Sequence, residues 1–308
     1  MTEVACIGEC MIELTQGAGN QLTQGFGGDT LNTAVYLARL GMQVDYITAL
    51  GDDPFSDELM TAWQGEGVGT ARVLRIAGKM PGLYAIRTNA VGERSFYYWR
   101  DSAAARALLD QPETDALLDG LKEYSLIYLS GITLSLFSDD GRDRLITGLT
   151  KARANGSRIA FDTNFRTRGW PMLDVARHAY QAMLDISDVV LASTEDLVPL
   201  YGERPHVELL DLLRADEVIL KLPEPACVVR SSGVDRTVKA GPVARVVDTT
   251  AAGDSFSAAY LAARLRGLSS PEAAEAGHRL AGVVVGHRGA IIPRSEMPSG
   301  LNTMATEH

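Results

Sequence analysis

Short apolar runs alternate with amphipathic segments through the middle of the chain. Four of these runs have the length and composition of buried strands: 125–130, 158–161, 188–191 and 217–222. Helical periods over 139–154 and 172–186 follow the first two runs. Fully apolar strands that alternate with helices are typical of a parallel sheet covered on both faces. The pattern therefore predicts an α/β fold with its active site at the carboxyl ends of the strands.

A pair of strand-like runs interrupts this alternation. Gly82–Thr88 and 94–100 are joined by Asn89-Ala90-Val91-Gly92, which suits a hairpin turn. The pair carries many aromatic side chains, namely Tyr84, Phe96, Tyr97, Tyr98 and Trp99. We expect a small β lid over residues 81–101 that also uses part of 10–26. Because both faces of the second run are bulky, the lid would cover a ligand on one side and contact a partner on the other.

Composition narrows the class of protein. The chain has 308 residues, 46% of them hydrophobic, and a formal net charge of −10. These values fit one domain spanning 1–308. The acidic balance argues against nucleic acid or an anionic membrane as a partner. The sequence contains no run of about 18 apolar residues, so it predicts no transmembrane helix. Three cysteines without a CxxC pair indicate buried thiols in a reducing, cytoplasmic compartment.

The strongest local motif is Val247-Asp248-Thr249-Thr250-Ala251-Ala252-Gly253-Asp254, followed by an amphipathic, Ala-rich helix over 254–265. The first N–H groups of a helix have no intrahelical partner, and the helix dipole adds partial positive charge there. Small side chains at Ala251, Ala252 and Gly253 would let an anion reach those groups. Asp254 could cap the helix, or it could accept a proton from a hydroxyl that attacks a bound phosphoryl group. The sequence leaves both roles open.

A glycine-rich turn precedes another predicted helix, in Gly25-Phe26-Gly27-Gly28-Asp29-Thr30-Leu31-Asn32. Asp29 or Thr30 is a candidate N-cap, and the same turn could approach the hydroxyl groups of a ligand. The turn is not a dinucleotide fingerprint, because Thr30 stands where the third glycine is needed. The sequence also has no P-loop, no G-x-S-x-G nucleophile elbow and no paired histidine or cysteine metal ligands.

Two arginines follow predicted strands. Tyr98 and Arg100 are two residues apart and project from one strand face, and Arg166 follows the strand 158–161 at its carboxyl end. In an acidic protein, two guanidinium groups in one pocket would suit a carboxylate, which each can bind with two parallel hydrogen bonds. Surface salt bridges are the other interpretation of these arginines.

Together these segments resemble the ribokinase-like family of ATP-dependent sugar kinases over nearly the whole chain. The two signatures are the Gly-Gly motif at 27–32 and the D-T-x-G-A-G-D motif at 248–254. The similarity is greater to the subgroup that acts on 2-keto-3-deoxygluconate, and it rests on Gly82-Leu83-Tyr84, Phe96-Tyr97-Tyr98-Trp99-Arg100, Asp162-x-Asn164-x-Arg166 and His287-Arg288-Gly289-Ala290-Ile291-Ile292-Pro293. The resemblance implies a three-layer fold with a mostly parallel central sheet and a small β lid.

The resemblance also implies a reaction, the transfer of the γ-phosphoryl group of ATP to the C6 hydroxyl of 2-keto-3-deoxygluconate. Asp254 would be the catalytic base, and the backbone N–H groups of Ala251, Ala252 and Gly253 would form an anion hole. The residues that bind the sugar acid would be Gly28, Asp29, Asn32, Tyr84, Tyr98, Arg100 and Arg166. The residues near the nucleotide would be Asn164, Lys221, Thr249 and Gly253.

Similar proteins use Mg²⁺ with ATP and pair through their lids as homo-oligomers, often dimers; a monovalent cation is a further candidate. Three segments depart from the family pattern. Ala251 replaces a glycine, and only Glu195 remains of the N-x-x-E motif that helps to arrange the metal. Prolines at 223 and 225 replace a G-x-x-G nucleotide loop. Glu195 is thus the one candidate metal residue, and the nucleotide preference stays open.

Two other functions are compatible with this scaffold: a kinase for a neutral ketose such as fructose, and a non-catalytic sugar sensor. Tyr98, Arg100 and Arg166 favour an acidic sugar over a neutral one. Asp254 at the helix start favours catalysis over sensing. The sequence does not distinguish the gluconate-derived acid from its C4 epimer in the galactonate series.

Overall fold

The computed structural model describes residues 3–17, 21–88 and 94–301. In this part of the chain the large sheet has the strand order β15-β14-β13-β12-β11-β10-β1-β4-β6. Its strands are β1 (Val4–Ile7), β4 (Val44–Ile47), β6 (Val68–Gly69), β10 (Leu126–Ser130), β11 (Arg158–Asp162), β12 (Val189–Ser193), β13 (Glu217–Lys221), β14 (Ala226–Ser231) and β15 (Val234–Lys239). The strands from β13 to β6 pair in parallel, whereas β14 and β15 are antiparallel additions at one edge.

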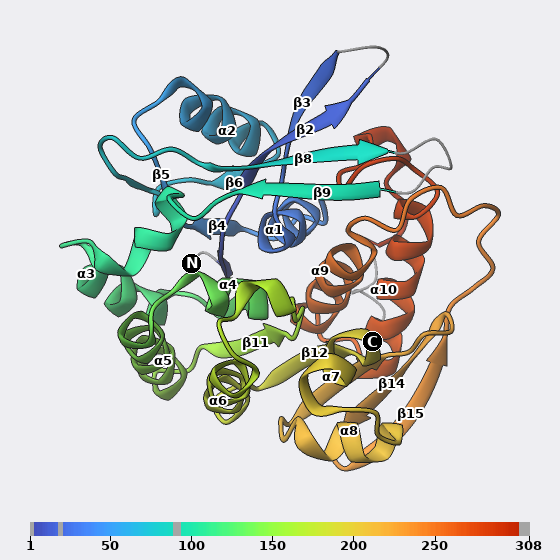
Figure 1. Ribbon diagram of the computed structural model, residues 1–308. Coiled ribbons are helices and arrows are strands. Elements are labelled where there is room, and N and C mark those ends of the chain that lie inside the picture. Colours follow the sequence, from blue (N-terminus) through green and yellow to red (C-terminus); the bar gives the residue numbers. More distant parts are fainter. Residues whose placement is uncertain (1–2, 18–20, 89–93, 302–308) are drawn as a thin grey trace.

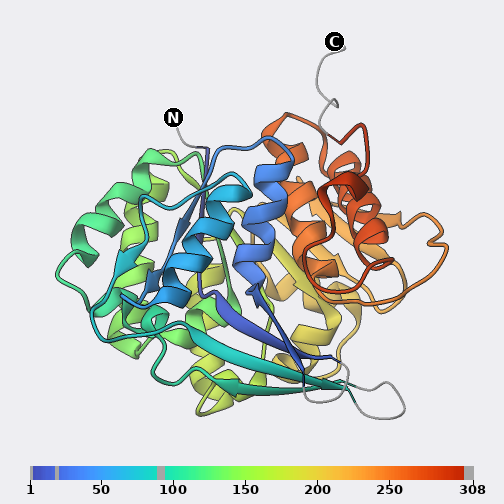
Figure 2. The same ribbon diagram turned by 90° about the horizontal axis from the view of Figure 1, so that it is seen from above.

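Helices cover both faces of this sheet and produce three layers (Figures 1 and 2). One layer contains α1 (Asp29–Arg39), α2 (Pro54–Gly65), α9 (Ala252–Leu265) and α10 (Ser270–Val284). The other contains α3 (Thr114–Asp119), α4 (Gly131–Leu136), α5 (Asp139–Ala154), α6 (Leu173–Leu184), α7 (Thr194–Tyr201) and α8 (His206–Leu212). Each layer packs its own cluster of buried apolar side chains against the sheet. The predicted α/β fold with a mostly parallel sheet is confirmed.

The predicted strands correspond to β10, β11, β12 and β13, and the predicted helix over 139–154 is α5. The second predicted helix is shorter than expected, because α6 ends at Leu184 with Asp185 as its C-cap. The helix predicted from Asp254 begins two residues earlier, at Ala252. Fully apolar runs predict these strands correctly because the strands are buried on both faces.

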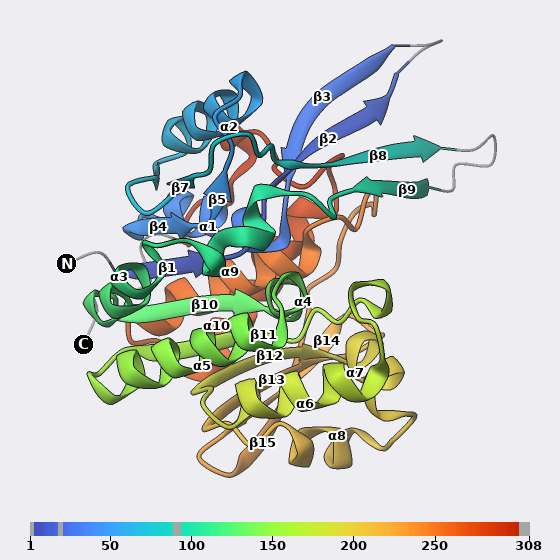
Figure 3. The same ribbon diagram turned by 60° about the vertical axis from the view of Figure 1, so that its left-hand side comes forward.

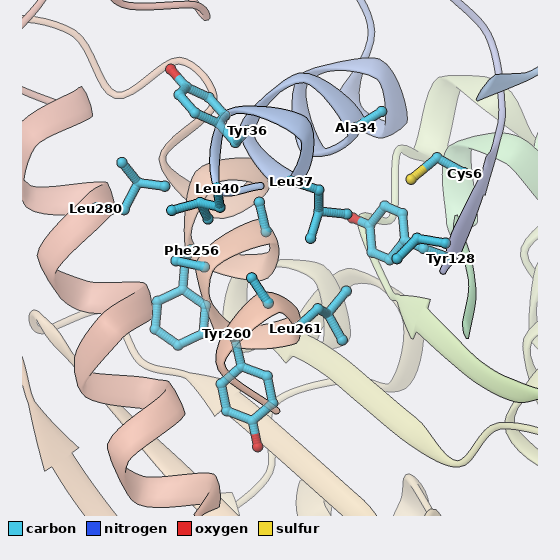
Figure 4. Close-up of a cluster of buried hydrophobic side chains, with 14 of the residues drawn as sticks. Cys6, Ala34, Tyr36, Leu37, Leu40, Tyr128, Phe256, Tyr260, Leu261 and Leu280 are labelled. Atoms are coloured by element: carbon cyan, nitrogen blue, oxygen red, sulfur yellow. The ribbon is translucent and has the colours of Figure 1, made fainter. Parts of the chain in front are cut away.

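Packing between α1 and α9 brings the two motif-bearing segments together. Figure 4 shows Leu37 of α1 and Leu40, the C-cap residue of that helix, facing the cluster that includes Phe256 and Tyr260 of α9. The rings of Phe256 and Tyr260 stack with centroids 6.2 Å apart. Full burial of each such side chain contributes about 1.5–3 kcal/mol. The cluster therefore fixes α1 against α9 and sets the two helix N-termini side by side.

A second sheet projects from the large domain (Figure 3). Its order is β3-β2-β8-β9, from β2 (Met11–Gln16), β3 (Leu22–Gly27), β8 (Gly82–Thr88) and β9 (Arg94–Trp99). The predicted turn at 89–92 lies outside the described residues. A further short pair joins β5 (Ala49–Leu50) to β7 (Leu74–Arg75). Among the helices described, none has the length and apolar character needed to cross a membrane.

Candidate active site

Four neighbouring parallel strands end in polar residues at one edge of the large sheet: Ser130, Asp162, Ser193 and Lys221. Lys221 Nζ lies 3.4 Å from Asp162 Oδ2, which also accepts a hydrogen bond of 2.8 Å from Ser257 Oγ on α9. Burial lowers the pKa of Lys221, but the carboxylates of Asp162 and two other aspartates outweigh it and raise that pKa above its ordinary value. The ammonium group is therefore charged at this edge of the sheet.

The start of α9 lies beside this ammonium group. A Cβ atom added to Gly253 would be 3.5 Å from Lys221 Nζ. Ala251 is the N-cap residue of α9 and has a left-handed conformation, with φ 59°. The prediction of three bare N–H groups is wrong for Ala252, whose N–H donates to the carbonyl oxygen of Thr249 at 3.2 Å. In the described part of the chain, no acceptor binds the backbone N–H of Gly253 or Asp254.

Asp254 is tied to α1. Asn32 Nδ2 donates to Asp254 Oδ2 at 2.8 Å, and Thr33 Oγ1 donates to the carbonyl oxygen of Asp254 at 3.3 Å. Burial, together with the negative charge of Asp29, raises the pKa of Asp254 to about 8. A carboxylate with a pKa near neutrality beside unpaired N–H groups has the properties of a general base.

Asp29 does not cap α1, contrary to the prediction, and neither does Thr30. The N-cap is Gly28, which makes no side-chain cap hydrogen bond. Asp29 Oδ2 instead accepts a hydrogen bond of 2.7 Å from Asn164 Nδ2, beyond the end of β11. Asn164, which we expected near the nucleotide, thus contacts a residue expected near the sugar. Gly28 is needed for a local reason, because a Cβ there would lie 2.2 Å from the carbonyl oxygen of Glu9.

Three of the predicted sugar-binding residues lie on or next to the second sheet. Tyr84 is buried, donates its hydroxyl hydrogen to Glu13 Oε2, and stacks on Tyr98 with ring centroids 5.9 Å apart. Tyr98 itself is exposed. Arg100 follows β9 and forms an ion pair with the buried carboxylate of Glu9. The second sheet therefore presents an aromatic pair and a cation from one edge.

Arg166 lies on the opposite side, beyond β11. Its Nη1 donates to Asp196 Oδ1 at 3.0 Å, and Asp196 Oδ2 accepts from Thr163 Oγ1 at 3.0 Å. Asp196 is buried, while the side chain of Arg166 is 61% exposed. One carboxylate thus anchors the guanidinium group, and the rest of it faces solvent, where a ligand can bind.

Two predicted residues stay apart from this network. Glu195 is exposed on α7, and its neighbour Asp196 is the buried acid. Thr249 is exposed and contributes its carbonyl oxygen to the turn before α9. No group of three or more potential metal ligands occurs among the residues described. The candidate metal role of Glu195 therefore gains no support from neighbouring ligands.

The sequence interpretation missed four acids that position the site: Glu9, Glu13, Asp162 and Asp196. A signal existed for Glu9 and Glu13, because both interrupt the apolar run that opens the chain. Asp162 belongs to the Asp162-x-Asn164-x-Arg166 stretch, but the sequence pattern indicates no role for it. Asp196 carries no signal of its own, since an acid in the first turn of a helix is common.

Comparison with known proteins decides the family. The sequence model described as pfkB family carbohydrate kinase matches residues 1–297. The chain belongs to this family. It is therefore a carbohydrate kinase with the ribokinase-like fold, as the resemblance implied.

Relatives in the pfkB family cover almost the whole chain. A 2-dehydro-3-deoxygluconokinase of Dickeya dadantii is 47% identical over 306 residues, which are 96% of this chain and 98% of the relative. A protein of the same name from Escherichia coli is 43% identical over 307 residues, covering 96% and 99% of the two chains. The crystal structure of a fructokinase with bound ATP from Xylella fastidiosa has a TM-score of 0.81 at 25% identity and covers 96% of this chain and 95% of its own.

Proposed function

We propose that this pfkB-family kinase transfers the γ-phosphoryl group of ATP to the C6 hydroxyl of 2-dehydro-3-deoxygluconate, also called 2-keto-3-deoxygluconate. The product would be the 6-phosphate of that acid. The two relatives above that carry this activity in their names support the choice of substrate. The observation that carries the chemistry is the hydrogen bond of 2.8 Å from Asn32 to Asp254, beside the N–H of Gly253, which no acceptor among the described residues binds.

Asp254 would act as the general base. Its carboxylate would accept the C6 hydroxyl proton as the oxygen attacks phosphorus, and Asn32 would hold the carboxylate in place. The N–H groups of Gly253 and Asp254 and the ammonium group of Lys221 would bind the negative charge that spreads over the phosphoryl oxygens. Alignment and charge stabilisation are what phosphoryl transfer chiefly requires from a protein.

The sugar acid would be bound between the second sheet and the large domain. Asp29 and Asn32 offer oxygen and nitrogen atoms for hydroxyl groups, and Tyr84 and Tyr98 offer ring faces and edges. Arg100 and Arg166 would bind the carboxylate from two sides, with Glu9 and Asp196 as their anchors. A neutral sugar would form no ion pair with these two guanidinium groups and would leave their remaining N–H donors unused, which favours the acid over the neutral sugar.

The nucleotide base would occupy an open pocket of about 410 Å³ between the loop after β15 and α10. Val243 and His278 are among the residues that line it. The same loop leads directly into the turn before α9, where Asp248 Oδ1 accepts hydrogen bonds from the N–H and hydroxyl of Thr250. A base in this pocket would therefore direct its phosphates toward the start of α9.

Mg²⁺ would be bound chiefly by the phosphates of ATP and by water. This ion usually keeps several waters and needs only one or two protein carboxylates, so a site without a cluster of acids fits it. When bound, the ion would neutralise charge on the β- and γ-phosphates. Dependence on a monovalent cation is a further part of the proposal and is tested by exchanging K⁺ for Na⁺ in the assay.

Oligomerisation through the second sheet is the remaining part of the proposal. Trp99 is 63% exposed and Tyr97 is 52% exposed, next to Phe96 on β9. An exposed aromatic strand of this kind marks an interaction surface, and a second copy of the same sheet is the partner that we propose.

The proposed function is tested with a panel of substrates and detection of ADP. Purified protein with Mg-ATP should phosphorylate 2-keto-3-deoxygluconate, and mass spectrometry with NMR should locate the phosphate on C6. The C4 epimer and fructose complete the panel. Turnover of fructose alone would overturn the choice of an acidic substrate, and absence of ADP formation with every sugar would indicate a sensor.

A further inference from the structure

The strands of the second sheet meet the large domain at one crowded point (Figure 3). Glu9 lies between β1 and β2, Gly82 begins β8, and Arg100 follows β9. A Cβ atom added to Gly82 would lie 3.0 Å from Glu9 Oε1 and 3.1 Å from Arg100 Cβ. The connection from β3 to α1 also passes here, because Gly28 packs against the backbone of Glu9. All four strands are thus joined to the rest of the protein around Glu9.

Glu9 and Arg100 form an ion pair at this junction, with side-chain exposures of 1% and 21%. Both carboxylate oxygens of Glu9, and Nε and Nη2 of Arg100, are buried without a hydrogen-bond partner among the described residues, so the contact between Nη2 and Oε2 is an ion pair rather than a hydrogen bond. Burial raises the pKa of Glu9 to about 6, although the charges of Arg100 and Arg106 oppose the rise. At neutral pH the carboxylate is therefore mostly ionised.

A buried ion pair of this kind adds little to the free energy of unfolding. The cost of removing two charges from water offsets much of their attraction, and an apolar pair of similar volume is often as stable. Each unsatisfied buried polar atom adds a further cost, because it has lost its hydrogen bonds to water. The pair is better explained by what it does to the direction of the Arg100 guanidinium group.

We propose that Glu9 is a positioning residue, which holds Arg100 in the orientation that binds the substrate carboxylate. The inference rests on the proposed function, in which Arg100 contacts the acid. A guanidinium group has five N–H donors in one rigid plane. The buried charge of Glu9 attracts Nη2 and so restricts where the guanidinium group can lie, while Nη1 stays available for a ligand. Glu9 thereby links the angle of the second sheet to recognition of an acidic sugar.

The direction in which KM for the acid changes distinguishes a positioning role of Glu9 from a role that only neutralises the charge of Arg100. Loss of the negative charge beside Arg100 would, by electrostatics alone, strengthen the binding of an anionic substrate. Loss of orientation would weaken it. Glu9→Gln removes the charge and keeps the shape, so the direction in which KM changes identifies the role.

For Glu9→Gln we expect KM for 2-keto-3-deoxygluconate to rise roughly 10-fold, as for the loss of one charge-assisted hydrogen bond. The kcat should stay within about threefold of the native value, and KM for Mg-ATP should not change, because Arg100 contacts only the sugar. Glu9→Asp keeps the charge on a shorter side chain and should have an intermediate KM for the acid. A merely structural role would alter the melting temperature without separating these constants.

Glu217→Gln is the matched control. Glu217 pairs with Arg264 at 2.8 Å, and the exposures of 4% and 23% resemble those of Glu9 and Arg100. This pair lies at the far end of α9 from Asp254. The control should lower the melting temperature and leave both KM values unchanged.

An unchanged or lowered KM for the acid in folded Glu9→Gln protein would overturn the inference and leave the proposed function standing. If circular dichroism shows that the Gln variant does not fold, Glu9→Asp decides by the same comparison: a native KM overturns the inference. Native protein that fails to phosphorylate the acid would overturn the proposed function, and the inference with it. The native assay is therefore performed first.

Discussion

Asn32 Nδ2 donates a hydrogen bond of 2.8 Å to Asp254 Oδ2, across 222 residues of sequence. Asn32 lies in the first turn of α1 and Asp254 in the first turn of α9, and the buried cluster between the helices holds both in register. The bond leaves Asp254 Oδ1 for another partner. Both residues belong to motifs that the sequence singles out, and their contact turns two separate motifs into one site.

Asp254→Asn should lower kcat by roughly 10²- to 10⁴-fold, the usual contribution of a general base. KM values should stay near native, because the amide has the shape of the carboxylate. Steady-state kinetics with ADP detection gives both constants. Asp235→Asn removes an exposed acid on β15 that pairs with Arg230, and it serves as the control with native turnover. Native kcat in the Asp254 variant would exclude the base role.

The pH dependence of kcat/KM should follow the ionisation of Asp254. A base acts only when ionised, and burial raises the pKa of this group to about 8. The value of kcat/KM should therefore increase with pH from 6 to 8.5 and level off above the pKa. Because the charge of Asp29 contributes to this raised pKa, Asp29→Asn should shift the rising limb to lower pH. A flat profile in the native enzyme, or an unshifted limb in the variant, would contradict the assignment.

Arg166→Ala should raise KM for the keto acid by roughly 10-fold or more, since a charge-assisted contact to the carboxylate is lost. Any turnover of fructose should change little. Arg168→Ala is a matched control, two residues away and exposed. Equal, small changes for the acid and for fructose would remove Arg166 from the carboxylate site.

Ala251→Gly should stabilise the protein. Ala251 has φ 59°, a left-handed conformation that costs a residue with a Cβ about 1 kcal/mol or more relative to glycine. Glycine has greater freedom in the unfolded chain, which offsets part of the gain. We expect the free energy of unfolding to increase by about 0.5–1 kcal/mol in urea titrations. A decrease would show that the methyl group contributes packing that outweighs the strain.

The exposed aromatic side chains of β9 predict that the protein forms a dimer in solution. Trp99→Lys combined with Tyr97→Lys should convert a dimer to a monomer in sedimentation experiments, because charged side chains disfavour a buried interface. Phe55→Lys alters an exposed aromatic residue on α2 and is the control that should remain dimeric. A native protein that sediments as a monomer would contradict oligomerisation through the second sheet.

Local patterns predicted the large sheet well and the N-cap of α1 poorly. Apolar runs mark buried strands because every side chain of such a strand meets the core. Whether a polar side chain caps a helix depends on which hydrogen-bond partner the fold places closest to it. Asp29 follows a glycine turn as an N-cap should, yet Asn164 binds its carboxylate and Gly28 takes the cap position. The competitor lies 135 residues away, so no local rule could find it.

The α/β architecture, the segment that carries Asp254 and the charged side chains available for an acidic sugar could all be predicted from the residue pattern. These features depend on the order of residue types over short stretches. Three pairings became visible only in the folded chain: the N–H of Ala252 donates to the carbonyl oxygen of Thr249, Glu9 pairs with Arg100, and Asp196 pairs with Arg166. Such pairings depend on distances between segments that the packing of helices and sheets sets, and the chemistry of the site depends on those distances.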